Sequence, residues 1–369
     1  MGIVVIVIAI VLLSSSSSSQ KESGPIKIGF IGPLSGDGAS FGETERNALL
    51  MAFDEINATA EFKDRPIELI AEDGKCTGKD ATIAIQKLIN IDKVKVVLGG
   101  VCSAETMAAA PIAEENKTLM FSAFSSNPAI TNAGDYIFRN SPSDSDVAKL
   151  DAQVILDKGF KKVALISENS DYSQGVRGIM KDIFASSSAT VVLDELFTGG
   201  LTDFRSFVTK AKGSGADVIY INPASSGKTG ALLVKQLRQA NIKTPIHGNF
   251  SLGTPDAFAT GAGMLEGVII SDGVRPGSKL QSLLNSYQAR FGSKASNDFE
   301  FGASYDRAFI ISKAINVVGY DATKIKDYLY SMPEYEGVIG KYRFDVNGDV
   351  TGGPFFTEYI IKGQEKIPL

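Results

Sequence analysis

The sequence predicts an α/β protein built from two doubly wound lobes. From Ile26 onward, apolar runs of strand length alternate with amphipathic helical segments, which is typical of a mostly parallel sheet. This alternation pauses between Asn140 and Ser145 and then starts again in a similar order. The length of 369 residues is too great for one ordinary domain and suits two. A content of 44% hydrophobic and 21% charged residues is that of a globular protein.

In the first lobe, continuous apolar runs predict strands, and the helical periodicity of apolar residues predicts the helices between them. The expected strands are Ile26 to Gly32, Ile67 to Asp73, Val94 to Leu98, Leu119 to Phe121 and Tyr136 to Phe138. The expected helices are Glu43 to Asn57, Lys79 to Asn90 and a segment from Ala104. Pro111 should kink or split the last of these, because proline lacks the amide that a helix needs.

The second lobe repeats this order of elements. Its expected strands are Lys162 to Ser167, Thr190 to Leu193, Asp217 to Asn222, Pro245 to Gly248 and Gly267 to Ser271. Its expected helices are Ala148 to Asp157, Val176 to Phe184, Asp203 to Lys212 and Gly230 to Ala240. Three further helices are expected at Lys279 to Phe291, Phe299 to Val318 and Lys324 to Tyr330. They either form a third layer or return to the first lobe.

The end of the chain predicts a hairpin and a last strand. Asn347-Gly348 is a strong signal for a hairpin turn, and Phe355 to Ile361 is an apolar run of strand length.

The N-terminus predicts export. Ile3 to Leu13 is an uncharged apolar run that is too short to span a bilayer at the usual length, and a serine run follows at Ser14 to Ser19. This pattern indicates the apolar core of an export signal, or a short membrane anchor, followed by a flexible spacer. No Cys follows the apolar run, so a lipoprotein anchor is not supported.

The chain has two cysteines, Cys76 and Cys102. Each comes about three residues after an expected strand, and parallel strands end at the same edge of a sheet. In an exported protein such a pair indicates a disulfide, and the alternative is two reduced, buried thiols. A bridge across a loop of roughly 25 residues would stabilise the fold by about 3 kcal/mol.

Several function classes are excluded or weakened. A net charge of -5 without basic clusters argues against nucleic acid binding. His247 is the only histidine, so a metal cluster made of several histidines is excluded, and histidine-based catalysis has one candidate. The GKT-containing stretch Asn222 to Thr229 lacks the first glycine of a phosphate-binding loop, and Pro223 removes an amide. The sequence therefore predicts neither an enzyme nor a bound metal or cofactor.

The stretch from Gly99 to Pro128 predicts a small anion site. Gly99-Gly100 ends a strand, and Ser103 stands where a helix N-cap would be. Helix N-terminal amides and a nearby hydroxyl together favour an anion. A second strand end adds the hydroxyls of Ser122, Ser125 and Ser126 at the edge where α/β sheets bind ligands. The alternative is that these residues merely cap helices.

Several stretches, taken in order, resemble one family. They are IKIGFIGPLSGDGASFGE, DEIN, IELIAEDGKC, GVCSAET, FSSNPAIT, YIFRNSPSD, VALISENSDYSQG and GKYRFDVNGDVTG. Their order and spacing resemble the type I periplasmic binding proteins, and in particular the leucine/isoleucine/valine-binding components of ABC transporters. The resemblance covers Pro25 to Gln364, and the family's paired cysteines match Cys76 and Cys102.

This resemblance implies a fold and a function. Two Rossmann-like lobes would be joined by a hinge of three crossings, at Ser141 to Asp144, Ser271 to Gly273 and Phe344 to Asn347. After a signal or anchor at residues 1–23, the first lobe would comprise 24–143 and 272–344, and the second 144–271 and 345–369. The protein would be a monomer that captures an amino acid or a related small carboxylate outside the cytoplasm and delivers it to an ABC permease. The alternative is a ligand-sensing domain that acts with a partner signalling protein.

The resemblance also implies the ligand contacts. Ser103 would bind the ligand carboxylate through its hydroxyl. The carbonyl of Phe124 and the hydroxyl of Ser126 would hold the ligand's ammonium and carboxylate. Phe41 would cover the ligand from the first lobe, and Tyr172 would contact it from the second.

Two positions depart from the family's pattern. Phe250 stands where amino-acid binders have the acid that pairs with the ammonium, and Ala224 stands where they have another aromatic. A buried ammonium without a carboxylate partner is costly. Either another acid pairs with the ammonium, or the ligand has none.

Overall fold

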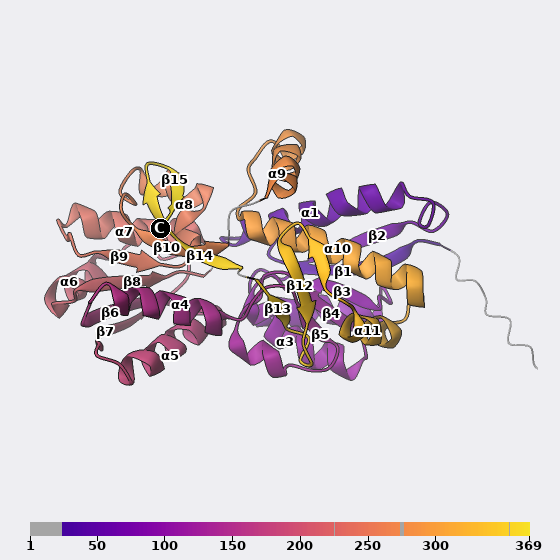
Figure 1. The fold of residues 1–369 in the computed structure, drawn as a ribbon, viewed down its shortest axis with the longest axis horizontal. Coiled ribbons are helices and arrows are strands. Elements are labelled where there is room, and N and C mark those ends of the chain that lie inside the picture. Colours follow the sequence, from indigo (N-terminus) through magenta and orange to yellow (C-terminus); the bar gives the residue numbers. More distant parts are fainter. Residues whose placement is uncertain (1–23, 225, 274–276, 354) are drawn as a thin grey trace, which may run out of the picture.

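The computed structural model describes residues 24–224, 226–273, 277–353 and 355–369. It has two α/β lobes side by side, with the chain passing repeatedly between them (Figure 1). The predicted fold class is confirmed. The predicted signal or anchor at residues 1–23 lies outside the described residues. Within the described ranges, no helix combines the length and apolar character needed to cross a membrane.

The first lobe contains a five-stranded parallel sheet in the order β2-β1-β3-β4-β5. Its strands are β1 Ile26–Gly32, β2 Ile67–Asp73, β3 Val96–Gly99, β4 Leu119–Ser122 and β5 Ile137–Arg139. The helices between them are α1 Ala39–Asn57, α2 Gly78–Asn90 and α3 Ser103–Glu115, and a short 3-10 helix η1 spans Pro128–Asn132. The bounds of β1 and β2 agree with the prediction, with β1 ending at Gly32 and β2 at Asp73.

The late helices return to the first lobe, which settles where they pack. They are α9 Ser278–Phe291, α10 Asp298–Val318 and α11 Ala322–Ser331. The longest of them, α10, shares a core with α1 and the sheet, to which Leu49, Phe53, Ala303 and Ile310 contribute. Leu280, Leu284 and Tyr287 of α9 pack beside α1 in a smaller cluster with Ala48 and Met51.

The second lobe contains a seven-stranded sheet in the order β15-β14-β10-β9-β8-β6-β7. In this sheet β14 pairs antiparallel with both of its neighbours, β10 and β15. Its strands are β6 Lys162–Glu168, β7 Thr190–Phe197, β8 Val218–Asn222, β9 Ile246–Gly248, β10 Ile269–Gly273, β14 Phe356–Lys362 and β15 Glu365–Pro368. Its helices are α4 Asp144–Asp157, α5 Asp171–Ala185, α6 Arg205–Ser214, α7 Gly227–Gln239 and α8 Pro255–Gly261, with a short 3-10 helix η2 at Phe250–Gly253.

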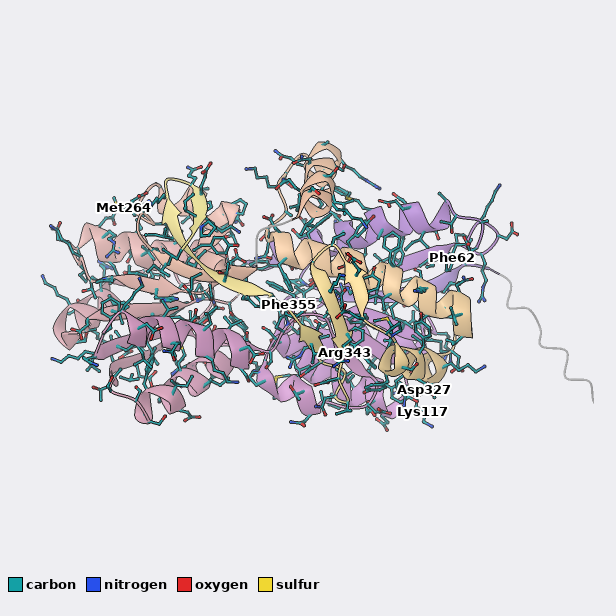
Figure 2. The ribbon with its side chains drawn as sticks, viewed as in Figure 1. Phe62, Lys117, Met264, Asp327, Arg343 and Phe355 are labelled. Carbon is teal, nitrogen blue, oxygen red and sulfur yellow. A yellow bond between two sulfur atoms is a disulfide. The ribbon has the colours of Figure 1, made fainter. Side chains whose placement is uncertain are left out.

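The third crossing differs from the one expected at Phe344 to Asn347. A small antiparallel sheet is formed by β11 Tyr335–Gly337, β12 Gly340–Phe344 and β13 Val350–Gly352. Asp349, just before β13, is bound by Arg139 of the first lobe through an ion pair of 2.6 Å. The third crossing, back into the second lobe, therefore lies between β13 and β14. Figure 2 shows Phe355 at this crossing.

Some local predictions were wrong or incomplete. Pro111 neither splits nor ends α3, which continues to Glu115. The short elements η2, α8, β11 and β15 were not predicted, because they have too few residues to show a periodic pattern. The predicted turn at Asn347-Gly348 does connect two paired strands, β12 and β13.

Candidate functional site

A pocket lies between the two lobes and encloses about 870 Å³ of space, part of it open to solvent. The first lobe lines it with residues from α1, the β3–α3 turn, the loop after β4 and the start of α10. The second lobe contributes the start of α4, the loop between β6 and α5, and η2. All of these segments except the start of α10 follow the carboxyl ends of parallel strands, where ligands bind in open α/β sheets.

All six residues that the sequence suggested as ligand contacts line this pocket. Phe41, Ser103, Phe124 and Ser126 come from the first lobe, and Tyr172 and Phe250 come from the second. The fold thus brings them to one place, although they are spread over most of the chain. Their contact with a ligand stays a prediction.

Ser103 is the first residue of α3, and Cys102 holds the N-cap position that the sequence had suggested for Ser103. The Ser103 hydroxyl oxygen accepts a hydrogen bond from the backbone amide of Asn127 at 3.2 Å. Its proton remains available for an acceptor in the pocket, which Cys102, Ser103 and Ala104 line together. A hydroxyl donor and the N-terminus of a helix suit a carboxylate.

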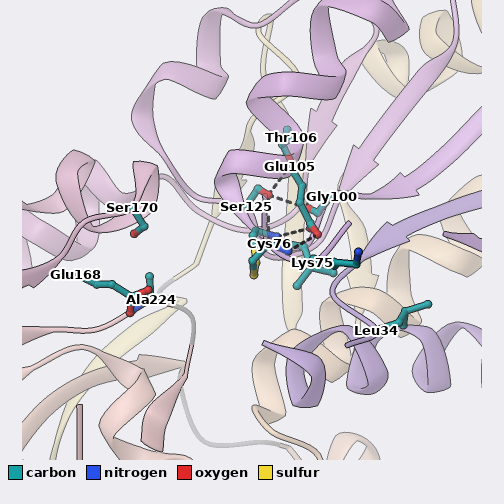
Figure 3. The surroundings of a disulfide bond; sticks show 12 residues. Leu34, Lys75, Cys76, Gly100, Glu105, Thr106, Ser125, Glu168, Ser170 and Ala224 are labelled. Carbon is teal, nitrogen blue, oxygen red and sulfur yellow. Dashed lines mark hydrogen bonds between the residues drawn. A yellow bond between two sulfur atoms is a disulfide. The ribbon is translucent and has the colours of Figure 1, made fainter. Parts of the chain in front are cut away.

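The predicted disulfide between Cys76 and Cys102 is confirmed, and both cysteines line the pocket. Figure 3 shows how Glu105 supports this bridge. The Glu105 carboxylate accepts the backbone amides of Cys76 and of Cys102, each at 3.0 Å. Burial raises the pKa of Glu105 to about 7. The strand end, the disulfide and the start of α3 therefore form one connected wall.

The two glycines before Cys102 let the backbones approach closely. Gly99 has a φ of +150°, and a Cβ there would lie 2.3 Å from the Ile31 carbonyl oxygen. At Gly100 a Cβ would lie 2.5 Å from the Cβ of Glu105. Only glycine fits at these positions, so the sequence signal of a glycine pair reflects close packing beneath the pocket.

Aromatic rings from both lobes meet at the pocket. The Phe250 ring lies 5.0 Å from the ring of Phe124 and 6.2 Å from the rings of both Phe41 and Tyr172. Phe41 and Phe124 are 5.6 Å apart. Because Phe250 belongs to the second lobe and packs on first-lobe rings, the lobes are closed against each other at this position.

Other direct contacts also join the lobes. The Asn127 side-chain amide donates to the Asp171 carbonyl oxygen at 2.6 Å. A Cβ on Gly175 of α5 would lie 3.0 Å from that same amide nitrogen. The Gly200 backbone has a φ of +74°, and a Cβ there would meet the Asp37 carboxylate at 2.7 Å. Small residues thus permit the close approach of the two lobes.

Tyr172 is held in place by a neighbour in the second lobe. Its hydroxyl accepts a hydrogen bond from the Asn249 side-chain amide at 3.2 Å. Burial raises the pKa of Tyr172, so its hydroxyl stays protonated. Asn249 also bonds to Asn222 and to the Pro223 carbonyl, which orients this side of the pocket.

Three acids of the second lobe line the pocket, and the sequence had assigned none of them to the site. They are Asp144, Glu168 and Asp171. The Glu168 carboxylate accepts the Ala224 amide at 2.8 Å, and Figure 3 shows both residues across the pocket from Cys76. Among the described lining residues there is no Lys or Arg. The pocket therefore has neutral donors near Ser103 and carboxylates on the second lobe.

Asp144 is the most unusual of these acids. Only 2% of its surface is exposed, and its Oδ2 atom has no hydrogen-bond partner. Burial raises the pKa of Asp144 to about 7, although the Ser126 hydroxyl and Arg139 oppose this increase. An ionised carboxylate in this position lacks a cation at hydrogen-bond distance, and a ligand could supply one.

The sequence did contain a signal for Asp144, in the stretch SPSD at the first crossing. Ser143 caps α4, and Asp144 is its first residue. An acid at this helix position is normally exposed and stabilises the helix dipole. Asp144 is instead packed against the first lobe, where its backbone amide donates to the Ser126 carbonyl at 2.8 Å, and the local pattern does not record this contact.

Comparison with known proteins gives a consistent result. The sequence model of a family described as "periplasmic binding protein" matches residues 25–363. A leucine-, isoleucine-, valine-, threonine- and alanine-binding protein of Pseudomonas aeruginosa is 27% identical over 335 residues, covering 89% of this chain and 88% of that protein. A Leu/Ile/Val-binding protein of Escherichia coli is 29% identical over 225 residues, or 60% of each chain.

Solved structures have the same fold. The branched-chain amino acid transporter substrate-binding protein LivJ of Streptococcus pneumoniae, in complex with isoleucine, matches with a TM-score of 0.83 and 26% identity, covering 93% of this chain and 97% of that one. A solute-binding protein of R. palustris in complex with benzoate also has a TM-score of 0.83, with 19% identity and coverage of 94% and 96%. The second likeness concerns the fold alone.

Proposed function

Because this chain belongs to the periplasmic binding protein family, we propose that it is an extracytoplasmic solute-binding protein for an amino acid with an apolar side chain. The two lobes close over the amino acid, and the closed protein delivers it as a monomer to the permease of an ABC transporter. It binds its ligand without transforming it. The observation that carries this choice of ligand is the buried carboxylate of Asp144 in the pocket, whose Oδ2 atom has no hydrogen-bond partner.

The charges around the pocket support a ligand with both a carboxylate and an ammonium group. The Ser103 hydroxyl and the start of α3 suit the carboxylate. Asp144 suits the ammonium, and it replaces the acid that is missing at Phe250. A bare carboxylate would leave Asp144 without a cation and would add another acidic group to the pocket, which is unfavourable at low dielectric constant.

The remaining walls support an apolar side chain. Phe41, Phe124 and Phe250 form one aromatic group, and Phe299 and Phe356 also line the pocket, with their rings 5.5 Å apart. Burying an aliphatic or aromatic side chain against these rings contributes about 1.5–3 kcal/mol. Transfer to a permease is favoured over the sensor alternative because matched proteins with a stated role are transporter binding proteins.

A thermal-shift screen of ligand-stripped protein tests this proposal. The panel contains leucine, isoleucine, valine and phenylalanine, the 2-keto acid of each, and benzoate. We expect the amino acids to raise the melting temperature, since a ligand at 100 times its Kd adds about 2.7 kcal/mol to the free energy of unfolding. The chain has no Trp, so an extrinsic dye reports unfolding. Stabilisation by the keto acids or benzoate alone would contradict an ammonium partner.

We expect Ser103→Ala to weaken amino-acid binding by about 1–3 kcal/mol, because the variant loses a hydrogen bond to a charged group. Isothermal titration calorimetry measures this change directly. Ser282→Ala, on the exposed side of α9, serves as the matched control and should bind like the unmodified protein. If Ser103→Ala keeps its affinity, the carboxylate does not bind at Ser103.

A further inference from the structure

We propose that Asp151, His247 and Glu358 form a site for one divalent transition-metal ion of the zinc class within the second lobe. The three residues come from α4, β9 and β14, which lie together in this lobe (Figure 1). One ligand atom from each side chain lies within 4.8 Å of the other two. The sequence predicted no metal because it counted histidines, whereas the fold adds two carboxylates to the single imidazole.

The distances between the ligand atoms fit a common metal ion. Nε2 of His247 lies 3.2 Å from Oδ1 of Asp151 and 3.3 Å from Oε2 of Glu358. Zinc binds nitrogen and oxygen ligands at about 2.0–2.2 Å, so two ligands at a tetrahedral angle are separated by roughly 3.4 Å. A small displacement of the side chains would place an ion between all three atoms.

The hydrogen bonding of Glu358 supports an ion at this position independently. Only 7% of Glu358 is exposed, and neither of its carboxylate oxygens has a hydrogen-bond partner of regular geometry. Both acids face the same nitrogen of His247, and one N–H group cannot serve two carboxylates well. A metal ion accepts all three ligands at once.

The charge at this location also requires compensation. Asp151 is fully buried, and 2% of His247 is exposed. Two carboxylates thus lie beside one imidazole out of contact with water, and buried charges are normally paired or bound to a metal. A divalent cation would balance the charge of both carboxylates at once.

A neighbouring residue orients the first ligand. The Tyr220 hydroxyl of β8 donates to Oδ2 of Asp151 at 2.5 Å, which leaves Oδ1 directed at His247. Outer-shell hydrogen bonds of this kind hold metal ligands in position. The ring of Tyr220 also lies 5.8 Å from that of His247.

The metal ion would join three segments that lead to the ligand pocket. The helix α4 begins with Asp144, β9 leads into Phe250, and β14 begins with Phe356. All three of these residues line the pocket. A bound cation would therefore stabilise the second-lobe half of the pocket without contacting the ligand.

Metal binding to the full-length protein, purified without a histidine tag and stripped with a chelator, tests this proposal. We expect it to bind one equivalent of Zn²⁺ with an increase in melting temperature, and to show the visible absorption of tetrahedral Co²⁺ when cobalt is added instead. Glu358→Gln and His247→Asn should lose both effects. Tyr220→Phe, which keeps the ligands, should lower the metal affinity roughly 10–100-fold.

The matched control is Glu195→Gln, because Glu195 is a surface acid of the same lobe that pairs with Lys210 at 2.8 Å. This variant should bind Zn²⁺ and Co²⁺ as the unmodified protein does. The proposal is overturned if the stripped protein binds no stoichiometric metal, or if Glu358→Gln binds as tightly as the control. Neither result depends on the identity of the amino-acid ligand, so the proposed function is tested separately.

Discussion

Replacing Asp144 with Asn should weaken amino-acid binding by about 3–5 kcal/mol, which is the usual cost of removing one partner of a buried ion pair. The substitution keeps the size of the side chain and removes its negative charge. The ligand ammonium would then be buried in a pocket with no carboxylate at the same position. Calorimetric titration of the variant with leucine or the best ligand of the screen measures this loss.

The same substitution should remove a pH dependence. In the protein without ligand, burial raises the pKa of Asp144 to about 7. Only the ionised carboxylate pairs with an ammonium, so the affinity is complete above pH 7 and decreases as the pH falls below it. Between pH 6 and pH 5 the expected decrease approaches tenfold. Asp144→Asn should show a weak and nearly constant affinity over this range.

Two controls make this prediction specific. Asp146→Asn lies on the same helix and removes an exposed charge, with 71% of its side chain accessible, so binding should not change. Without ligand, Asp144→Asn should melt at the same temperature as the unmodified protein or higher, because it removes a buried charge without a cation. Unchanged affinity of Asp144→Asn for leucine would assign the ammonium to another acid, and Glu168 is then the next candidate in the pocket.

Replacing Arg307 with Met should lower the free energy of unfolding by about 3–5 kcal/mol. Arg307 is completely buried in α10, where it pairs with Glu45 of α1 and donates to the Phe121 carbonyl of β4 at 2.9 Å. It thus joins both long helices to the sheet. Met has a similar volume, so the loss comes mainly from the charge and the hydrogen bonds. Urea-induced unfolding, followed by circular dichroism, measures it.

The loss of stability in Arg307→Met should depend on pH, because the positive charge of Arg307 compensates the negative charge of acids in the core. Glu45 and Glu300 are both fully buried, and burial raises the pKa of each. A carboxyl with a raised pKa stabilises the fold below its unfolded-state pKa and loses this contribution as the pH increases. Without the arginine both pKa values should increase further. Arg307→Met should therefore be destabilised more at pH 8 than at pH 5.

The matched control is Arg290→Met in α9. Arg290 pairs with Asp54 at 2.7 Å, but 46% and 61% of the two side chains are accessible. Exposed pairs of this kind contribute about 0–1 kcal/mol. A loss for Arg307→Met as small as that of Arg290→Met would show that the core accommodates Glu45 and Glu300 without a cation.

Local sequence patterns were sufficient for most elements. The bounds of β1 could be predicted to the residue, because this strand is buried and almost continuously apolar and ends at Gly32. The bounds of the edge strand β2 also agree, although only its first residue, Ile67, is buried. Helix ends were less well predicted. The helix α4 begins at Asp144, four residues before the predicted Ala148, since its polar first turn has no apolar periodicity. The prediction for Pro111 was wrong, because α3 continues through this exposed residue to Glu115.

Some residues of the candidate site could be predicted from the local sequence pattern, and others only from the family resemblance. Ser103 and the two cysteines follow strand ends, and the rule that parallel strands end at one edge placed them together correctly. The family resemblance supplied Phe41, Phe124, Tyr172 and Phe250, which the pocket also contains.

The sequence by itself therefore determined the alternation of strands and helices, the division into two lobes, the disulfide and the sheet edge at which the pocket lies. Each of these depends on contacts or patterns that are short in the chain or repeat along it. Only the tertiary structure decided which of 42 acidic residues are buried and which groups face them. Asp144 becomes a candidate ligand partner, and Asp151 joins His247 and Glu358, because segments more than ninety residues apart pack together and exclude water. The energy of a charge depends on that desolvation, which no local pattern records.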